Sequence, residues 1–180
     1  VLGHELYGKT IGVLGTGAIG SHLIRICHGF GMNVLAYDLY PKQELVDRYD
    51  VKYTNLDEIY RESDYLSLHL PASDETHQMI NWETISQMKS SIYLINTARG
   101  DLINEEDLYD ALKEKRIRGA GLDAFMQEPF TDSRFYTLEN VLMTPHSGAY
   151  TAESVEQTLV TAAEEVLRVL AGSKPLHPVG

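Results

Sequence analysis

The sequence predicts an α/β protein whose parallel sheet is covered by helices on both faces. Three observations carry this prediction. A short β-branched run at 10–14, typical of a buried parallel strand, leads into the turn Gly15-Thr16-Gly17-Ala18-Ile19-Gly20. Apolar residues at helical spacing follow this glycine turn, and a second apolar strand at 33–37 ends on Asp38. Further strands alternate with helices along the chain, which predicts a Rossmann-type, doubly wound sheet with the strand order 3-2-1-4-5-6.

The glycine turn, set between a strand and a helix, predicts a dinucleotide site. Gly15 permits the tight turn, Gly17 lets a pyrophosphate approach the backbone, and Gly20 lets the helix pack closely on the strand. The helix N-terminus offers N–H groups and a positive dipole end to the phosphates. Asp38 stands where a carboxylate accepts hydrogen bonds from the adenosine ribose and repels a 2′-phosphate, which favours NAD over NADP. A simple turn without a ligand is the alternative interpretation.

Five apolar residues at helical spacing predict the buried face of the first helix: Ile19, Leu23, Ile26, Cys27 and Phe30. Cys27 is the single cysteine, so it forms no internal disulfide. We interpret it as a core thiol rather than a nucleophile, which suits a reducing, cytoplasmic compartment.

Local signals place the remaining elements. Pro41 and Pro71 each stop a strand, whereas Asn55 and Asn104 are expected helix caps. The expected helices and helical turns lie at 43–49, 55–59, 76–79, 81–88, 104–116 and 151–171. The expected further strands lie at 51–54, 64–70, 91–96, 120–122 and 141–143.

The length of 180 residues suits one domain with a sizeable core. We assign 1–180 to an NAD-binding domain in which 151–171 is a C-terminal amphipathic helix and 172–180 a loose tail. A net charge of −11 argues against nucleic acid or an anionic membrane as a partner. No apolar run reaches the ~20 residues of a membrane span, and no histidine or cysteine cluster has metal-ligand spacing, so no metal is expected.

Three ionisable residues stand out as candidates for chemistry. Arg99 directly follows a strand, where a guanidinium can hold a carboxylate by two parallel bonds. His146 follows a strand through Thr144-Pro145 and can donate a proton near neutral pH. Glu128 lies in a loop, where a carboxylate beside an imidazole would stabilise its charged form. Taken singly, each could also be a solvated or structural loop residue.

Together with their surroundings these residues resemble the D-isomer-specific 2-hydroxyacid dehydrogenases. The resemblance covers nearly the whole chain, and its most specific segments contain the arginine, the acid and the histidine. The matching segments are 6–12 with the glycine turn, 30–34, 68–71, 75–76, 88–89, 95–102, 121–123, 128–129 and 144–146.

The resemblance implies a role for each matching residue. Arg99 would bind the substrate carboxylate and polarise the 2-oxo group, and His146, paired with Glu128, would be the acid/base. Asp123 would accept a hydrogen bond from the nicotinamide carboxamide, and Ala18 and Ile19 would contact the pyrophosphate through their backbone. The residues expected to line the rest of the cofactor cleft are Leu70, Pro71, Thr76, Thr97 and Ala98.

The resemblance also implies partners. The substrate would be a small 2-oxo or 2-hydroxy acid, and the intact protein a homodimer. The family builds its substrate domain largely from a segment before the cofactor domain, and that segment is missing from this sequence. We therefore expect this chain alone to bind NAD and to reduce 2-oxo acids weakly or not at all. The identity of the 2-oxo acid stays open.

Two other functions share this scaffold. One is an NAD-sensing regulatory module of the corepressor type, which retains similar residues. The other is a different NAD-dependent class, such as a formate dehydrogenase or a hydrolase with a tightly bound cofactor. The short stretch from Pro129 to Thr144 and Ser147 after the histidine fit the simple 2-hydroxyacid pattern better.

Overall fold

The computed structural model describes residues 3–132, 134–176 and 178. The chain forms two compact units, Val1–Pro145 and His146–Gly180. The first unit holds the sheet, and the second holds one long helix, α6 (Ala152–Leu170), capped by the Thr151 side chain. The tail expected at 172–180 falls partly outside the described residues.

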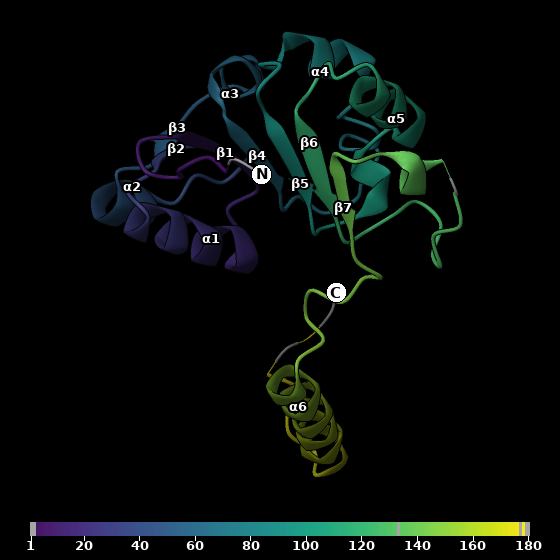
Figure 1. Cartoon of the computed structure of the whole chain (residues 1–180). Helices are drawn as coiled ribbons and strands as arrows, with labels where there is room; N and C mark the ends of the chain where they lie inside the picture. Colours follow the sequence, from purple (N-terminus) through teal and green to yellow (C-terminus); the bar gives the residue numbers. More distant parts are fainter. Residues whose placement is uncertain (1–2, 133, 177, 179–180) are drawn as a thin grey trace. The chain divides into compact units, whose positions relative to one another are not determined.

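The described part of the first unit contains a seven-stranded parallel sheet in the order β3-β2-β1-β4-β5-β6-β7 (Figure 1). This confirms the predicted order 3-2-1-4-5-6, and the strand expected at 141–143 is the seventh, at the edge of the sheet. Its strands are β1 (Thr10–Leu14), β2 (Asn33–Tyr37), β3 (Lys52–Tyr53), β4 (Tyr65–Leu68), β5 (Tyr93–Asn96), β6 (Gly119–Leu122) and β7 (Val141–Met143). The strand order reverses between β1 and β4, which is the position at which doubly wound sheets bind ligands.

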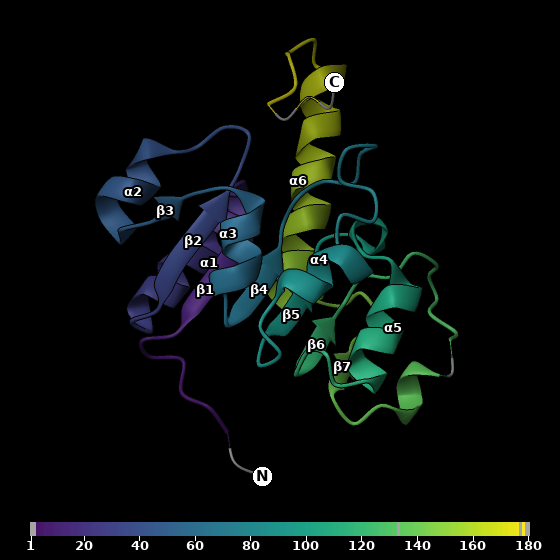
Figure 2. The same ribbon diagram turned by 90° about the horizontal axis from the view of Figure 1, so that it is seen from above.

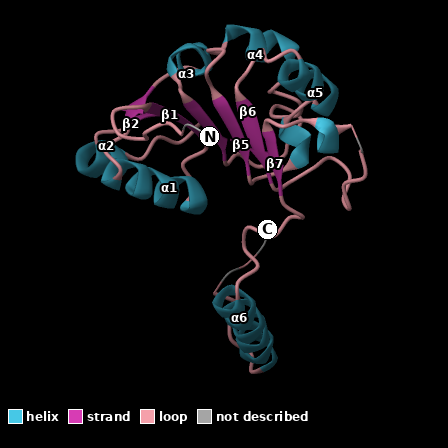
Figure 3. Cartoon of the chain, in the orientation of Figure 1, coloured by secondary structure: helices cyan, strands magenta, loops and turns pink. Residues whose placement is uncertain are grey.

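Helices cover the sheet on its two faces (Figures 1 and 3). They are α1 (Ala18–Gly29) and α2 (Gln43–Tyr49) on one face, and α3 (Leu56–Glu62), α4 (Trp82–Gln87) and α5 (Glu105–Lys113) on the other. Two short 3₁₀ turns complete the unit, η1 (Gly100–Leu102) and η2 (Phe135–Thr137). The view from above shows that α3, α4 and α5 follow one another across the sheet (Figure 2).

Asparagine caps begin three of these helices. The side chains of Asn55, Asn81 and Asn104 each accept a hydrogen bond from the backbone N–H three residues further on. Such a cap satisfies one of the free N–H groups of a helix and stabilises it by about 1 kcal/mol. The predicted caps at Asn55 and Asn104 are confirmed.

Two predicted helical segments are wrong. Residues 76–79 form turns, because the Thr76 hydroxyl donates to the Pro71 carbonyl oxygen at 2.7 Å and Gln78 has a left-handed φ of 48°. Side-chain bonds of this kind compete with helical ones. The helix predicted to reach 116 ends at Lys113, because Lys115 has a left-handed φ of 56°.

The predicted buried face of α1 is wrong at three positions. Ile19, Ile26 and Phe30 are 68%, 52% and 54% exposed. The buried positions are Gly20, Ile24 and Cys27, which are spaced four and three residues apart along one side of the helix. Gly20 must face the strand because it packs against the backbone of Gly15. The close contact, rather than the largest apolar residues, therefore sets the rotation of α1.

Two buried clusters fill the faces of the sheet. The larger joins α3, α4 and α5 to the strands and includes Ile59, Leu68, Ile85 and Leu108. The smaller joins α1 and α2 to β1 and β2 and includes Cys27, whose thiol pKa is raised by burial. The prediction of a core thiol is confirmed.

Replacement of Ser63, at the end of α3, by alanine should stabilise the fold. Its side chain is fully buried, and within the described residues its Oγ has no hydrogen-bond partner. A buried, unsatisfied hydroxyl costs about 1–3 kcal/mol. We expect Ser63→Ala to increase the free energy of unfolding by about 1 kcal/mol in urea titrations.

The matched control for this prediction is Ser67→Ala. Ser67 is also buried, but its Oγ lies 2.9 Å from His69 Nε2 in a hydrogen bond. Ser67→Ala should lower the free energy of unfolding. A larger loss for Ser63→Ala than for Ser67→Ala would contradict the prediction.

Candidate functional site

The candidate site lies in the first unit, at the carboxyl ends of the central strands. The glycine turn follows β1, Asp38 follows β2, Leu70 follows β4 and Arg99 follows β5. Parallel strands carry all these loops to the same edge of the sheet. Ligands of doubly wound sheets bind at this edge.

The glycine turn is held by contacts that exclude side chains. Gly15 has a φ of +96°, and a Cβ there would lie 2.7 Å from the carbonyl of His69. A Cβ at Gly20 would lie 2.0 Å from the carbonyl oxygen of Gly15. At Gly17 a Cβ would meet nothing within 4 Å, so the space beside this residue is open.

The N-terminus of α1 is suited to an anion. Gly17 is the N-cap and has no side chain to cap the helix, and the first turn contains no acidic residue. The first N–H groups of a helix have no partner within it, and the helix dipole adds partial positive charge. Together with the open space at Gly17, these N–H groups fit a pyrophosphate, so the residues present fit a dinucleotide cofactor.

Asp38 is oriented by three hydrogen bonds. Its Oδ2 accepts from the Thr16 N–H at 2.6 Å and the Thr16 hydroxyl at 3.0 Å, and its Oδ1 accepts from the Tyr40 N–H at 2.9 Å. Burial raises the pKa of the Asp38 carboxyl, but the bonds from Thr16 and Tyr40 outweigh it, so the pKa lies below its usual value. The carboxylate is therefore charged at neutral pH.

The loop that carries Arg99 depends on Asn96, which is fully buried at the end of β5. The Asn96 side chain donates to the Arg99 carbonyl oxygen at 2.8 Å and accepts from the Ala98 N–H at 3.0 Å. Thr97 and Ala98 lie in this loop. The Arg99 guanidinium is exposed and donates to the Ala98 carbonyl oxygen at 2.7 Å. An exposed guanidinium on a fixed backbone can bind a carboxylate.

The loop at 123–129 lies directly against the arginine loop. The Asp123 N–H donates to the Asn96 carbonyl oxygen at 2.9 Å, and a Cβ at Gly100 would lie 1.9 Å from the carbonyl carbon of Phe125. Asp123 is buried and accepts from the Thr144 hydroxyl. The two loops thus form one surface that carries Arg99 and Asp123.

Glu128 lies on this second loop. Its Oε1 accepts from the Phe125 N–H at 3.1 Å, and the residue is exposed. Glu105, at the start of α5, fixes the same loop because its Oε1 accepts from the Met126 N–H at 2.7 Å. Burial raises the pKa of the Glu105 carboxyl.

His146 is the first residue of the second unit and has a left-handed φ of 54°. Glu128 belongs to the first unit. The two residues thus belong to different units, and the pairing of His146 with Glu128 stays a prediction. The first unit does bring Gly15, Asp38, Arg99 and Asp123 to one edge of the sheet.

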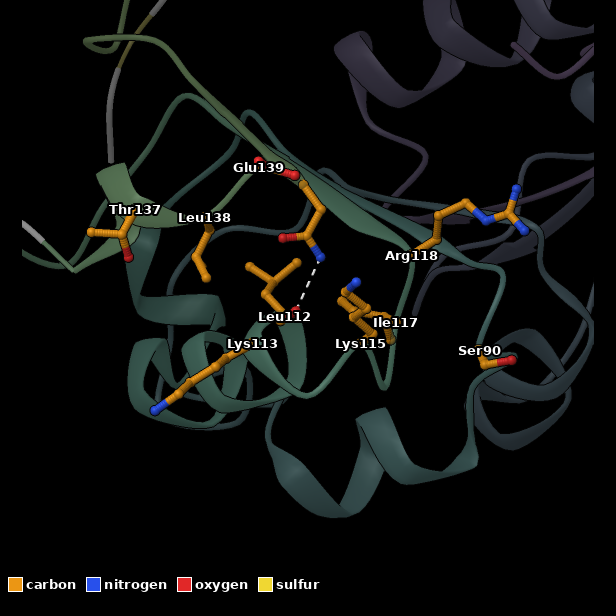
Figure 4. A pocket seen from close by; sticks show the side chains of 10 residues that line it. Ser90, Leu112, Lys113, Lys115, Ile117, Arg118, Thr137, Leu138 and Glu139 are labelled. Atoms are coloured by element: carbon orange, nitrogen blue, oxygen red, sulfur yellow. Dashed lines mark hydrogen bonds between the residues drawn. The ribbon is translucent and has the colours of Figure 1, made fainter. Parts of the chain in front are cut away.

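A separate cavity of about 540 Å³ lies near the opposite, amino ends of β6 and β7 (Figure 4). The dashed line marks the Asn140 side chain donating to the Leu112 carbonyl oxygen at 3.1 Å. Lys113 and Arg118, at its two sides, point away from each other. The cavity therefore does not direct these two cations towards one point.

Among the described residues, no group of three or more histidine, cysteine, aspartate or glutamate side chains is placed to hold a metal ion. No described helix combines the length and the apolar character needed to cross a bilayer.

The comparison with known families decides the relationship. The family model "D-isomer specific 2-hydroxyacid dehydrogenase, NAD binding domain" matches residues 1–148. The chain belongs to this family. Its cofactor is NAD, and its fold is that of the NAD-binding domain.

Three relatives illustrate the similarity. A D-3-phosphoglycerate dehydrogenase of Synechocystis is 42% identical over 95% of this chain and 31% of the relative. A hydroxypyruvate reductase of Thermotoga maritima is 40% identical over 93% of this chain and 55% of the relative. The structure of D-lactate dehydrogenase with NAD⁺ from Lactobacillus jensenii has a TM-score of 0.92 at 32% identity, covering 99% of this chain and 58% of that one. The chain thus spans from 31% to 58% of the length of these relatives.

Four residues of this dehydrogenase domain support the site without having been predicted: Thr16, Tyr53, Asn96 and Glu105. The role of Asn96 could have been inferred from the sequence, since an asparagine at a strand end commonly bonds to the backbone of the following turn. Thr16 lies within the predicted glycine turn. Glu105 and Tyr53 act on partners far along the chain, so no local pattern marks them.

His69 should make the stability of this domain depend on pH. It follows β4, and burial lowers the pKa of its imidazole to about 4 from an ordinary value near 6.5. The unfolded chain therefore binds more protons than the folded one between these pH values, and stability falls as the pH drops from about 6.5 towards 4. Between pH 7.5 and pH 5 the loss from His69 should reach about 2 kcal/mol.

The measurement compares wild type with His69→Gln by urea titration at several pH values. The variant keeps a polar side chain near Ser67 but cannot be protonated. We expect its stability to fall less between pH 7.5 and pH 5. Parallel curves for the two proteins would show that His69 does not titrate in this way.

Proposed function

We propose that this chain is the cofactor-binding part of an enzyme that reduces small 2-oxo acids to D-2-hydroxy acids with NADH. The carrying observation is the surface formed by the loops after β5 and β6. There the loops that carry the exposed Arg99 guanidinium and the buried Asp123 carboxylate are held against each other by contacts through Asn96 and Gly100. The glycine turn lies at the same edge of the sheet.

The proposed roles follow the chemistry of each group. The Arg99 guanidinium binds the substrate carboxylate and polarises the adjacent carbonyl group. His146 donates a proton to the carbonyl oxygen, and Glu128 favours the protonated imidazole. NADH, when bound, supplies the hydride that carbon 2 receives. The product is then a hydroxy acid, and in the reverse direction His146 accepts the proton.

The remaining proposed residues hold the cofactor. Ala18 and Ile19 present backbone N–H groups to the pyrophosphate, and Asp38 accepts from the adenosine ribose. Asp123 accepts from the nicotinamide carboxamide. The cleft is lined further by Leu70, Pro71, Thr76, Thr97 and Ala98.

We extend the proposal to the setting of the longer protein. It is a cytoplasmic homodimer that acts on a small 2-oxo or 2-hydroxy acid. The free, buried Cys27 thiol supports a reducing compartment. The exposed Ile19, Ile26 and Phe30 on α1 support a contact between subunits, because exposed apolar side chains favour association.

The cofactor site can be tested with two glycine variants of this chain. A Cβ at Gly17 meets nothing in the protein but would enter the space proposed for the pyrophosphate. Gly17→Ala should leave the melting temperature within about 2 °C of wild type and weaken NADH binding about tenfold or more. Gly20→Ala should lower both the melting temperature and the affinity for NADH, because its Cβ would overlap the Gly15 carbonyl oxygen.

Fluorescence titration with NADH and thermal melts of both variants measure these effects. Unchanged NADH binding by Gly17→Ala would count against the proposed pyrophosphate position. A stable Gly20→Ala variant would show that α1 can shift without cost.

The catalytic assignment requires the full-length protein. Arg99→Ala and His146→Ala should each reduce kcat/KM for 2-oxo acids by about 10² to 10⁴-fold. The Kd of NADH should change by no more than about twofold. Arg48→Ala is the control, because Arg48 is an exposed residue of α2 that pairs with Glu44.

A panel of 2-oxo acids, assayed with NADH, supplies the substrates. If the full-length protein binds NADH but turns over none of these 2-oxo acids, the result favours an NAD-sensing regulator over an enzyme. Full activity of both variants would overturn the assigned roles.

A further inference from the structure

A chain of hydrogen bonds ends at Asp38 and begins in a part of the sequence to which no role has been assigned. The Lys42 N–H donates to the Tyr53 hydroxyl oxygen at 3.1 Å, and the Tyr53 hydroxyl donates to Thr16 Oγ1 at 3.0 Å. The Thr16 hydroxyl donates to Asp38 Oδ2 at 3.0 Å. We call these four groups the Tyr53 relay.

The direction of the relay is fixed at both ends. A backbone N–H such as that of Lys42 can only donate, and an ionised carboxylate can only accept. Each of the two hydroxyl groups between them has one proton, so each donates towards Asp38 and accepts from the opposite side. Hydrogen bonds aligned in this way strengthen one another.

The relay joins segments far apart in the sequence. Tyr53 lies on β3, at the edge of the sheet, and Thr16 lies in the glycine turn. Thr16 is fully buried, so its hydroxyl depends on protein partners. Its carbonyl oxygen also accepts from the Ser21 hydroxyl of α1 at 2.7 Å. The position of the Asp38 carboxylate is thus tied to the glycine turn and to β3 together.

The bonds to Asp38 leave a defined place for a ligand. Each carboxylate oxygen has two lone pairs. Oδ2 uses both on Thr16, and Oδ1 uses one on the Tyr40 N–H. One acceptor position remains, on Oδ1, which suits a single hydroxyl donor. A 2′-phosphate has no proton to donate when ionised and would face the carboxylate charge.

We propose that Tyr53 and Thr16 are positioning residues that hold the Asp38 carboxylate for a ribose hydroxyl and so set the preference for NADH over NADPH. This inference rests on the proposed role of Asp38 in cofactor binding. Neither residue contacts the cofactor through its hydroxyl group in this account, because both hydroxyls are used within the relay. Their effect passes through Asp38.

The test measures the Kd of NADH and of NADPH for the chain of 180 residues by fluorescence titration. Tyr53→Phe removes the donor to Thr16 and frees the Thr16 hydroxyl to turn away from Asp38. We expect the Kd of NADH to rise about five- to tenfold. The Kd of NADPH should stay within about twofold, so the preference for NADH narrows by a similar factor.

Thr16 variants separate the relay from a general loosening of the fold. Thr16→Val removes the hydroxyl at nearly constant volume and should narrow the preference at least as much as Tyr53→Phe. Thr16→Ser keeps the hydroxyl and should retain the wild-type ratio. In the double variant Tyr53→Phe/Thr16→Val, the effect should equal that of Thr16→Val alone, because the relay is already broken. If Tyr53→Phe does not fold, the Kd values of NADH and NADPH for Thr16→Val, compared with those for Thr16→Ser, test the same inference.

Tyr65→Phe is the matched control. Tyr65 begins β4, is also half-buried, and its hydroxyl makes no hydrogen bond within the described residues. It should leave both Kd values and the melting temperature unchanged. Equal weakening of NADH and NADPH in the Tyr53 and Thr16 variants would overturn the inference while leaving the proposed function intact. Failure of the wild-type chain to bind either nucleotide would overturn both.

Discussion

The approach of α1 to the glycine turn leaves no room for a side chain, since a Cβ at Gly20 would lie 2.0 Å from the carbonyl oxygen of Gly15. This contact fixes the rotation of α1, so Gly20, Ile24 and Cys27 face the sheet. It also places the uncapped N-terminus of the helix beside the open space at Gly17. The anion-binding geometry and the packing of the first helix therefore have the same cause. The exposed Ile19 is a consequence of this constraint.

The rest of the candidate site depends on main-chain contacts between neighbouring loops. Gly15 lies against the backbone that follows β4, and the Asp123 N–H bonds to the Asn96 carbonyl oxygen. Such contacts order the loops without using the side chains that face a ligand. Arg99 is accordingly held at its backbone carbonyl, whereas Asp38 is held through its carboxylate, which keeps one acceptor position on Oδ1 for a partner. A site built in this way is pre-organised, which lowers the ordering cost of binding.

The fold and much of the site could be predicted from the sequence, because the signals are local. Asp38 directly follows β2 and Arg99 lies in the short loop after β5, and parallel strands carry their carboxyl ends to one edge. The strand order follows from the alternation of strands and helices. The rotation of α1 could not be predicted from apolar spacing, because a backbone contact at Gly20 outweighs the burial of Ile19 or Ile26.

The roles of the supporting residues Tyr53, Thr16 and Glu105 could not be predicted from a local sequence pattern, because their partners are distant in the sequence. Tyr53 and Thr16 are 37 residues apart, and Glu105 and Met126 are 21 residues apart. Only the folded sheet brings these pairs together, and a tyrosine on a short edge strand has no distinctive neighbours in the sequence. The pairing of Glu128 with His146 joins two separately described units, so it stays a prediction.

The contact between Gly100 and the Phe125 carbonyl group couples the loops that follow β5 and β6. There is no space at Gly100 for even a methyl group, so any side chain at this position would have to displace the 123–129 loop. A change beside Arg99 would in this way also reach the loop that begins at Asp123. Variants that redesign this edge of the sheet should therefore retain Gly100 and change positions that do not touch it.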